Sequence, residues 1–284
     1  MEKKYFIEQD TAWFCVSFFY SKKNWGKLIQ EIQLFYEQKK MLLNYCIISL
    51  SEDKGEHIKL ILSSSANKKY LDLIQKDIDK YFHSFISDNP SNKDKQFQYG
   101  EENLWCNYDN NSIEWNKFLI YPSIYNQYIN YSQATSSLIL HLLADNYSLS
   151  NVFSISIFLS TRTLKICSDM YRETPNFIVD ITLKQLASLY RCHSIVAEFN
   201  LEEKLELYEI DYEETIEIIE EYWNDEEDSY LLYKQWENEV KKIITIKPSS
   251  FLLLNILQWN HFYINDYMKI LIINLLKNYC LKNT

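Results

Sequence analysis

The chain has 284 residues, of which 47% are hydrophobic and 16% aromatic, and its formal net charge is −10. This composition excludes a disordered protein, because enough apolar surface is available to form a core, and the acidity argues against nucleic acid as a partner. Only three glycines are present and each is isolated, so neither a P-loop nor a dinucleotide-binding fingerprint can be formed.

The six cysteines are dispersed, with no C-x-x-C pair and no Cys/His spacing typical of a metal site. We therefore expect reduced, buried thiols in a cytoplasmic protein, and we predict no requirement for a metal or an organic cofactor. The amino-terminal residues are polar, and the longest apolar run, near residues 251–257, is far shorter than the ~20 residues of a membrane span. We expect neither a signal peptide nor a membrane partner.

The first ninety residues alternate between β-branched or aromatic runs and segments with apolar residues at helical spacing. A turn ending at Gly55 separates two of the apolar runs, which predicts a β-hairpin, and Asn67 can cap the helix that follows. Strands are predicted at residues 11–20, 43–50 and 57–62, and helices at residues 22–39 and 67–85. This β-α-β-β-α order predicts an α+β fold with a predominantly antiparallel sheet.

A polar loop at residues 87–96 is followed by two short predicted strands, 103–105 and 115–121, around a turn at residues 109–111. From residue 131 onward the pattern is helical. Helices are predicted at residues 133–143, 151–169, 182–197, 201–223, 229–245 and 249–281. We predict a single domain over residues 1–284, with a sheet-bearing half (1–130) packed against a helical half (131–284).

Charge is concentrated in residues 201–228, which hold fourteen acids and one lysine, so that the rest of the chain sums to +3. Apolar residues recur within this segment at helical spacing. The acidic side chains are therefore interpreted as the solvated face of a helix.

Two segments carry a resemblance to a known family. Residues 55–62 (GEHIKLIL) and 255–263 (NILQWNHFY) resemble the Gly-Pro-His-Leu-Arg-Leu-Arg-Phe strand and the terminal Leu-Leu-His-Met-His-x-Asn-Arg helix of the thiopeptide-type bacteriocin biosynthesis domain. The same domain is the C-terminal elimination domain of class I lanthipeptide dehydratases. Weaker matches follow in the family's order at residues 13–20, 118–122 and 132–143. The resemblance implies an enzyme that acts on a modified ribosomal peptide.

In the eliminating members of this family, two arginines of the strand hold the carboxylates of a glutamylated Ser or Thr, and a histidine of the helix assists removal of the α-proton. The corresponding arginine positions here are Lys59 and Ile61, and the histidine positions are Gln258 and Asn260. An isoleucine cannot pair with a carboxylate as arginine does. Glutamate elimination is therefore not expected.

The resemblance extends to stand-alone thiopeptide pyridine synthases, which join two dehydroalanines of a leader-bearing precursor by a formal [4+2] aza-cycloaddition and then expel water and the leader peptide. Loss of the elimination residues favours this function. The abundance of Asn, Ile, Lys and Tyr suggests an AT-rich genome, as in producers of the thiocillin and micrococcin type. The modified precursor would be the partner, together with other enzymes of the pathway. Two alternatives stay open: an elimination subunit of a split dehydratase, and a non-catalytic subunit that binds the precursor.

Pyridine formation needs a hydrogen-bond donor for an amide oxygen, an acceptor for its N–H proton, and an acid for the loss of water. The candidate residues are polar or aromatic side chains in or near the matched segments, and for each the alternative is an ordinary structural role. The catalytic candidates are Gln258, His57, Tyr121 and Tyr125, and the substrate- or leader-binding candidates are Lys59, Tyr128, Asn260, Lys22, Lys23 and Lys27. We predict that Gln258 and His57 face one cavity. The other histidines, including His261, show no partner pattern.

Overall fold

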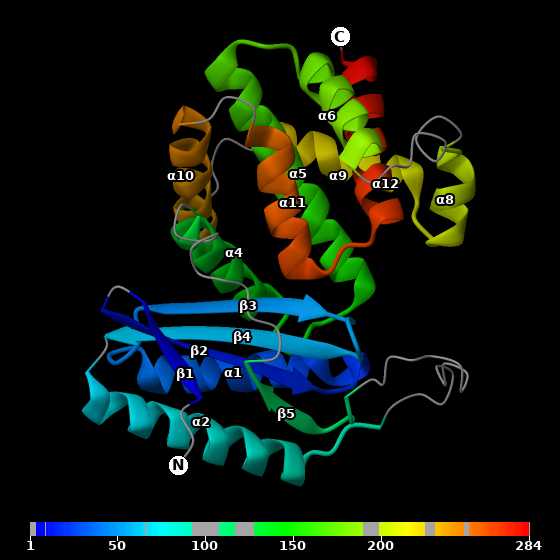
Figure 1. Ribbon diagram of the computed structural model, residues 1–284. Helices are drawn as coiled ribbons and strands as arrows, with labels where there is room; N and C mark the ends of the chain where they lie inside the picture. Colours follow the sequence, from blue (N-terminus) through cyan, green and yellow to red (C-terminus); the bar gives the residue numbers. More distant parts are fainter. Residues whose placement is uncertain are drawn as a thin grey trace. The chain divides into compact units, whose positions relative to one another are not determined.

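The computed structural model describes residues 4–8, 10–65, 67–92, 108–116, 128–189, 199–224, 231–246 and 250–283. The chain divides into two compact units (Figure 1). The first unit comprises Met1–Asn151 with His261–Tyr263, and the second comprises Val152–Asn260 with Ile264–Thr284. The predicted α+β class with an antiparallel sheet is confirmed. The prediction of a single domain stays a prediction.

The first unit is built on a five-stranded antiparallel sheet. Its strands are β1 (Tyr5–Glu8), β2 (Thr11–Phe19), β3 (Tyr45–Ser51), β4 (His57–Ser65) and β5 (Ser112–Trp115). The order is β1-β2-β4-β3, and β5 pairs with the second half of β2. The predicted hairpin is confirmed as β3–β4. The four-residue β1 was not predicted. It lies in a polar segment and is too short to show the alternation of apolar and polar residues that is typical of a strand.

The strand predicted at residues 103–105 lies outside the described residues, as does most of the one predicted at 115–121. The described strand β5 begins earlier, at Ser112, directly after the predicted turn. Asn111 ends that turn with a φ of 64°, in the left-handed region that asparagine tolerates better than most residues.

Two helices, α1 (Trp25–Lys39) and α2 (Lys68–Asp88), cover one face of the sheet (Figure 1). A 3₁₀ turn, η1 (Lys22–Asn24), leads into α1. Trp25, Leu28 and Ile32 of α1 are fully buried, and the ring of Phe82 on α2 lies 4.4 Å from that of Phe18 on β2. Because side chains alternate along a strand, Phe18 and its even-numbered neighbours face the helices and the odd-numbered residues of β2 face the other way.

Helix α4 (Ile129–Leu142) belongs to the first unit and contacts the edge strand β3. Gln133 Oε1 accepts a hydrogen bond from the backbone N–H of Cys46 at 2.6 Å, and Ser136 Oγ accepts one from that of Ile48 at 3.0 Å. The Ile48 carbonyl receives the Nδ1–H of His261 at 2.7 Å. Side chains thus satisfy backbone groups that an edge strand would otherwise expose.

The second unit is helical in its described residues. Its helices are α5 (Leu149–Tyr171, whose first turn lies in the first unit), α6 (Pro175–Leu189), α8 (Leu201–Leu207), α9 (Tyr212–Asn224), α10 (Leu231–Ile246), α11 (Ser250–Phe262, whose end lies in the first unit) and α12 (Asp266–Lys282). Helix α12 contacts α6, α8 and α9, and its centre is buried from Ile270 to Ile273. Within the described residues, no helix is both long and apolar enough to cross a bilayer.

Two of the predicted helices were wrong in length. The one predicted at residues 201–223 is divided into α8 and α9, with Glu209 at a φ of 53° between them, and the one predicted at 249–281 is divided into α11 and α12, with Tyr263 at a φ of 55°. A left-handed residue ends a helix. After the second break, Asn265 caps α12 by accepting a hydrogen bond from the Met268 N–H.

Other sequence-based expectations hold. In α9 the apolar Ile216 and Ile219 are buried while Glu213, Glu217 and Glu220 are exposed, which confirms the solvated acidic face. The four described cysteines are unpaired and buried: Cys15, Cys46, Cys167 and Cys280.

Helix α6 starts at Pro175, seven residues before the predicted Thr182, because proline is well suited to the first position of a helix. The predicted end of this helix lies outside the described residues.

Candidate functional site

The face of the sheet opposite α1 and α2 carries a row of polar side chains. Ser49 of β3 pairs with Lys59 of β4, Lys59 pairs with Ser17 of β2, and Ser17 pairs with Glu114 of β5. Directly paired residues of antiparallel strands point to the same face. Ser49, Lys59, Ser17 and Glu114 therefore form one polar row that crosses four strands.

Apolar side chains lie on both sides of the polar row. On one side, Trp13 and Tyr45 stack with ring centroids 6.2 Å apart within an apolar cluster that includes Ile61. On the other side, the ring of Phe19 lies 4.6 Å from His57 and 4.7 Å from Tyr108. Polar groups between aromatic side chains can bind a peptide through its amides and its rings together.

Lys59 is the cation of this row. Its side chain is only 16% exposed, and its Nζ lies 3.7 Å from the Asp53 carboxylate in the turn between β3 and β4. Burial lowers the pKa of Lys59, and the negative charge of Asp53 opposes that shift. Next to it, the side chain of Ser17 is buried. These groups can donate hydrogen bonds to a substrate carbonyl or carboxylate.

His57 begins β4 and is fully buried. Its Nδ1–H donates to the Gly55 carbonyl at 2.7 Å, which leaves the proton on Nδ1 and makes Nε2 the acceptor. Burial lowers the pKa of His57 to about 4. The imidazole is therefore neutral near pH 7 and can accept a proton but has none to spare as an acid.

His261 lies at the end of the polar row, although no partner pattern surrounds it in the sequence. Its Nδ1 is 2.7 Å from the Ile48 carbonyl and 3.4 Å from the Ser49 hydroxyl. Burial lowers its pKa to about 4, so this imidazole is neutral as well. Its hydrogen-bond partners are more than 200 residues away in sequence, so no local pattern predicts them. The sequence feature that could have singled out His261 is its position three residues after Gln258, on the same helical face.

Gln258 is fully buried in the second unit. Its Nε2 donates to Ser160 Oγ of α5 at 2.8 Å and to Asn255 Oδ1 of α11 at 2.9 Å. Asn255 in turn donates to the Phe251 carbonyl at 2.8 Å. Asn260, on the same helix, is exposed. The cavity predicted to join Gln258 and His57 stays a prediction, because the two residues belong to different units.

No protein-family model matches the sequence, and a search of curated proteins finds no match. Solved structures do match. The chain is similar in fold to a solved pyridine synthase. TbtD, the pyridine synthase from thiomuracin biosynthesis, superimposes with a TM-score of 0.63 over 95% of this chain and 98% of its own, at 11% sequence identity. At this identity the likeness shows the fold alone, and it extends along nearly the whole chain.

Within this pyridine synthase-like fold, the predicted leader-binding lysines are divided between two places. Lys22 contacts the Glu52 carboxylate, and Lys27 of α1 donates to Asn89. Lys59 contacts Asp53, the next residue of the same turn, from the opposite face of the sheet. Lys23 lies in η1 beside Lys22. The β3–β4 turn thus holds one lysine with each of two consecutive acids.

Of the three predicted tyrosines, one lies in the part of the chain that the structure describes. Tyr121 and Tyr125 lie outside the described residues, and Tyr128 is half-buried directly before α4. Among the described residues, no three His, Cys, Asp or Glu side chains come together as a metal site. The prediction that no metal or cofactor is needed stays a prediction.

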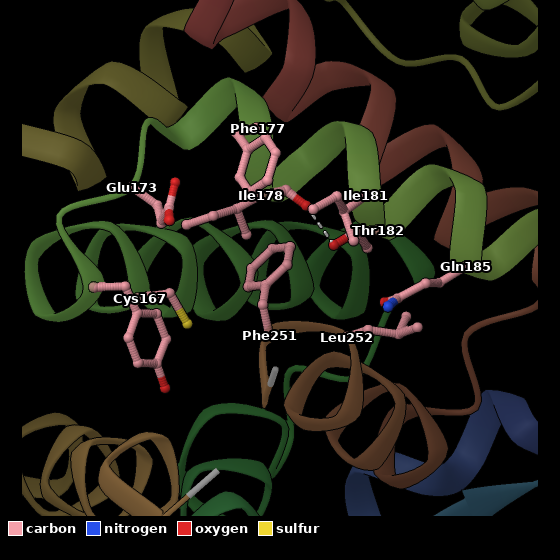
Figure 2. A pocket seen from close by; sticks show the side chains of 10 residues that line it. Cys167, Glu173, Phe177, Ile178, Ile181, Thr182, Gln185, Phe251 and Leu252 are labelled. Carbon is pink, nitrogen blue, oxygen red and sulfur yellow. Dashed lines mark hydrogen bonds between the residues drawn. The ribbon is translucent and has the colours of Figure 1, made fainter. Parts of the chain in front are cut away.

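The second unit of the pyridine synthase-like fold contains a pocket of about 410 Å³ between α5, α6 and α11 (Figure 2). Its walls are mainly apolar or aromatic, with three polar side chains among them. The lining residues are Cys167, Tyr171, Glu173, Phe177, Ile178, Ile181, Thr182, Gln185, Phe251 and Leu252. A pocket of this volume can hold a ring-bearing side chain. Its residues gave no signal in the sequence because spaced apolar residues look the same whether they line a pocket or a core.

Proposed function

We propose that this protein is a thiopeptide pyridine synthase that cyclises a modified precursor peptide, of the thiocillin and micrococcin type. The observation that carries the proposal is the match of its fold to TbtD over 95% of the chain. Lys59 and Ile61 stand where an eliminating relative has two arginines, so the pair of guanidinium groups that would hold a glutamyl carboxylate is not there.

In the proposed reaction, the protein positions the two dehydroalanines and transfers protons. One dehydroalanine amide tautomerises to its iminol and adds to the second dehydroalanine, and the ring then loses water and the leader peptide. Gln258 offers an amide donor and an amide acceptor in one plane, neutral His57 offers an acceptor, and Tyr121 and Tyr125 are proposed to donate. Holding the two alkenes together removes most of the entropic barrier.

We further propose that flat azole rings of the substrate bind against aromatic side chains. The α5–α6–α11 pocket offers Phe177, Phe251 and Tyr171 for this purpose. Rings that stack or meet edge to face gain about 0.5–1.5 kcal/mol beyond their burial. Azole-free analogues of the precursor are therefore expected to bind more weakly.

Mass spectrometry of a bis-dehydroalanine precursor incubated with the purified protein tests the proposal. A pyridine synthase converts the precursor to a macrocycle that has lost water and releases the intact leader peptide as an amide, with or without prior EDTA treatment. An elimination subunit instead releases glutamate from a glutamylated peptide. A binding subunit leaves every mass unchanged, and either of these results would refute the proposal.

The Gln258→Ala variant is expected to lower turnover by roughly 10²-fold or more, the usual size of a proton-transfer contribution. Its melting temperature should fall as well, since Ser160 and Asn255 lose a buried partner. Asn255→Ala is the matched control, because it disturbs the same network but keeps the Gln258 amide. Equal turnover in the two variants would show that Gln258 is only structural.

Leader binding is proposed to occur on the first unit near Lys22, Lys23, Lys27 or Lys59, mainly through apolar contacts. Charge reversal at Lys22, Lys23 and Lys27 is expected to weaken leader binding modestly, since exposed pairs contribute ~0–1 kcal/mol each and salt screens them. Neutralising Glu213, Glu217 and Glu220 of α9 should leave the affinity unchanged. A hydrogen-exchange footprint of the leader on α8 and α9 would contradict this placement.

A further inference from the structure

The turn of the β3–β4 hairpin holds a carboxylate in a fixed position. The Ser51 hydroxyl donates to Asp53 Oδ2 at 3.3 Å, and the Asp53 N–H donates back to the same hydroxyl at 3.3 Å. This arrangement restricts Asp53 to one side of the turn. The oxygen that Ser51 contacts is also the one 3.7 Å from Lys59 Nζ.

The two partners differ strongly in their exposure. The Lys59 side chain is 16% exposed and that of Asp53 is 66% exposed. Burial disfavours the ammonium and a nearby anion favours it, so the pKa of Lys59 is lowered with Asp53 acting in the opposite direction. A lysine in this setting gives up its proton more readily than one on the surface and can still be recharged.

Other titratable groups face Lys59 from each neighbouring element. His57 precedes it on the same face of β4, and His261 lies beside Ser49; burial lowers the pKa of both imidazoles to about 4, so both are neutral near pH 7. Glu114 of β5 lies beyond Ser17 in the polar row. Among the described residues, Asp53 is an anion that contacts the ammonium directly, and Glu114 lies two strands away.

We propose that Lys59 is the proton donor for the loss of water during cyclisation, and that Asp53 is a positioning residue that keeps the ammonium oriented and charged. This rests on the proposed pyridine synthase function. After ring closure, the former amide carbon carries a hydroxyl group. In the enamine tautomer of the ring, Lys59 Nζ–H protonates that oxygen, the C–O bond breaks, and water leaves while the ring nitrogen's lone pair forms the C=N bond. The proton of the ring N–H then returns to the lysine amine.

Two substitutions at Lys59 distinguish a proton donor from a simple anion-binding group. Lys59→Arg keeps the positive charge and the hydrogen bonds, but a guanidinium does not release a proton at any working pH. Both Lys59→Arg and Lys59→Met are expected to lower the rate of water loss by roughly 10²-fold or more, with the leader-bearing, undehydrated ring accumulating. Near-normal product formation by Lys59→Arg would overturn the proposal.

Pyridine formation by the wild-type protein distinguishes a failure of the proposed function from a failure of the role proposed for Lys59. If it forms no pyridine from the precursor, the proposed function fails and the role of Lys59 in it falls too. If it forms pyridine and Lys59→Arg does as well, only the further inference fails. Circular dichroism of each variant shows whether a loss of turnover reflects unfolding.

The role of Asp53 has a readout that does not depend on turnover. Competitive acetylation across pH, with the Lys59 peptide quantified by mass spectrometry, reports the titration of its amine. Asp53→Asn removes the favourable anion, so the midpoint should move to lower pH, and the alkaline limb of the rate should follow. Glu52→Gln is the control, because Glu52 pairs with Lys22. An unmoved midpoint in Asp53→Asn would overturn its assignment.

Discussion

Replacing Glu237 with glutamine is expected to lower the free energy of unfolding of the second unit by about 3–5 kcal/mol, the cost of breaking a buried ion pair from one side. Arg162 of α5 donates through Nε to Glu237 of α10 at 2.7 Å, and the two side chains are 10% and 12% exposed. The Arg162 Nη1 also donates to the Tyr222 carbonyl at 3.2 Å. Without the carboxylate, the guanidinium stays enclosed but loses its ion pair with α10.

Urea unfolding followed by circular dichroism measures this loss. Glu239→Gln is the control on the same helix, because Glu239 pairs with the exposed Lys242 and such pairs contribute ~0–1 kcal/mol. Replacing Arg162 and Glu237 together with apolar residues of similar volume should recover much of the stability. A loss below about 1 kcal/mol in Glu237→Gln would show that the pair is not effectively buried.

Acidification is expected to destabilise the first unit well before most carboxylates titrate. His57 and His261 are buried, and burial lowers the pKa of each to about 4 from 6.5. A depressed pKa means that the unfolded chain binds the proton first, so the stabilisation is complete above pH 6.5 and is lost as the pH falls toward 4. Each imidazole can account for up to about 3 kcal/mol.

Unfolding free energies measured at pH 7, 6 and 5 test this expectation. His261→Gln keeps a donor for the Ile48 carbonyl but removes the titration, so stability should fall less steeply with acid than in the wild type. His83→Gln, at an exposed position on α2, serves as the control and should keep the wild-type slope. A wild-type slope in His261→Gln would contradict the assignment of acid sensitivity to this buried histidine.

Local patterns were sufficient to predict most of the first unit. The apolar run at residues 11–19, the turn at Gly55 and the helical faces of α1 and α2 each produce a signal within one element. The breaks at Glu209 and Tyr263 produce none, because neither left-handed position is occupied by glycine or asparagine and the apolar spacing continues across both.

The candidate site required information that local patterns do not contain. Lys59 and His57 can be placed on one face of a strand from their spacing alone. The addition of Ser17, Ser49 and Glu114 depends on the register between four strands, which is set by the folded sheet. The family resemblance pointed to Lys59, but its contact with Asp53 follows from the geometry of the hairpin turn.

The way in which β3 is covered has a consequence for synthesis of the chain. The Ile48 N–H has its hydrogen-bond partner only after Ser136 has been synthesised. The Ile48 carbonyl has its partner only after His261, which is 213 positions further along the chain. At ~5–20 residues per second, a ribosome needs roughly 10–40 s to add that stretch. The edge is open until α4 has been made, and the Ile48 carbonyl stays uncovered for the whole interval, so the nascent sheet can pair with another chain. Nascent or truncated chains that end before His261 are therefore the forms in which this protein is most exposed to aggregation and most in need of a chaperone.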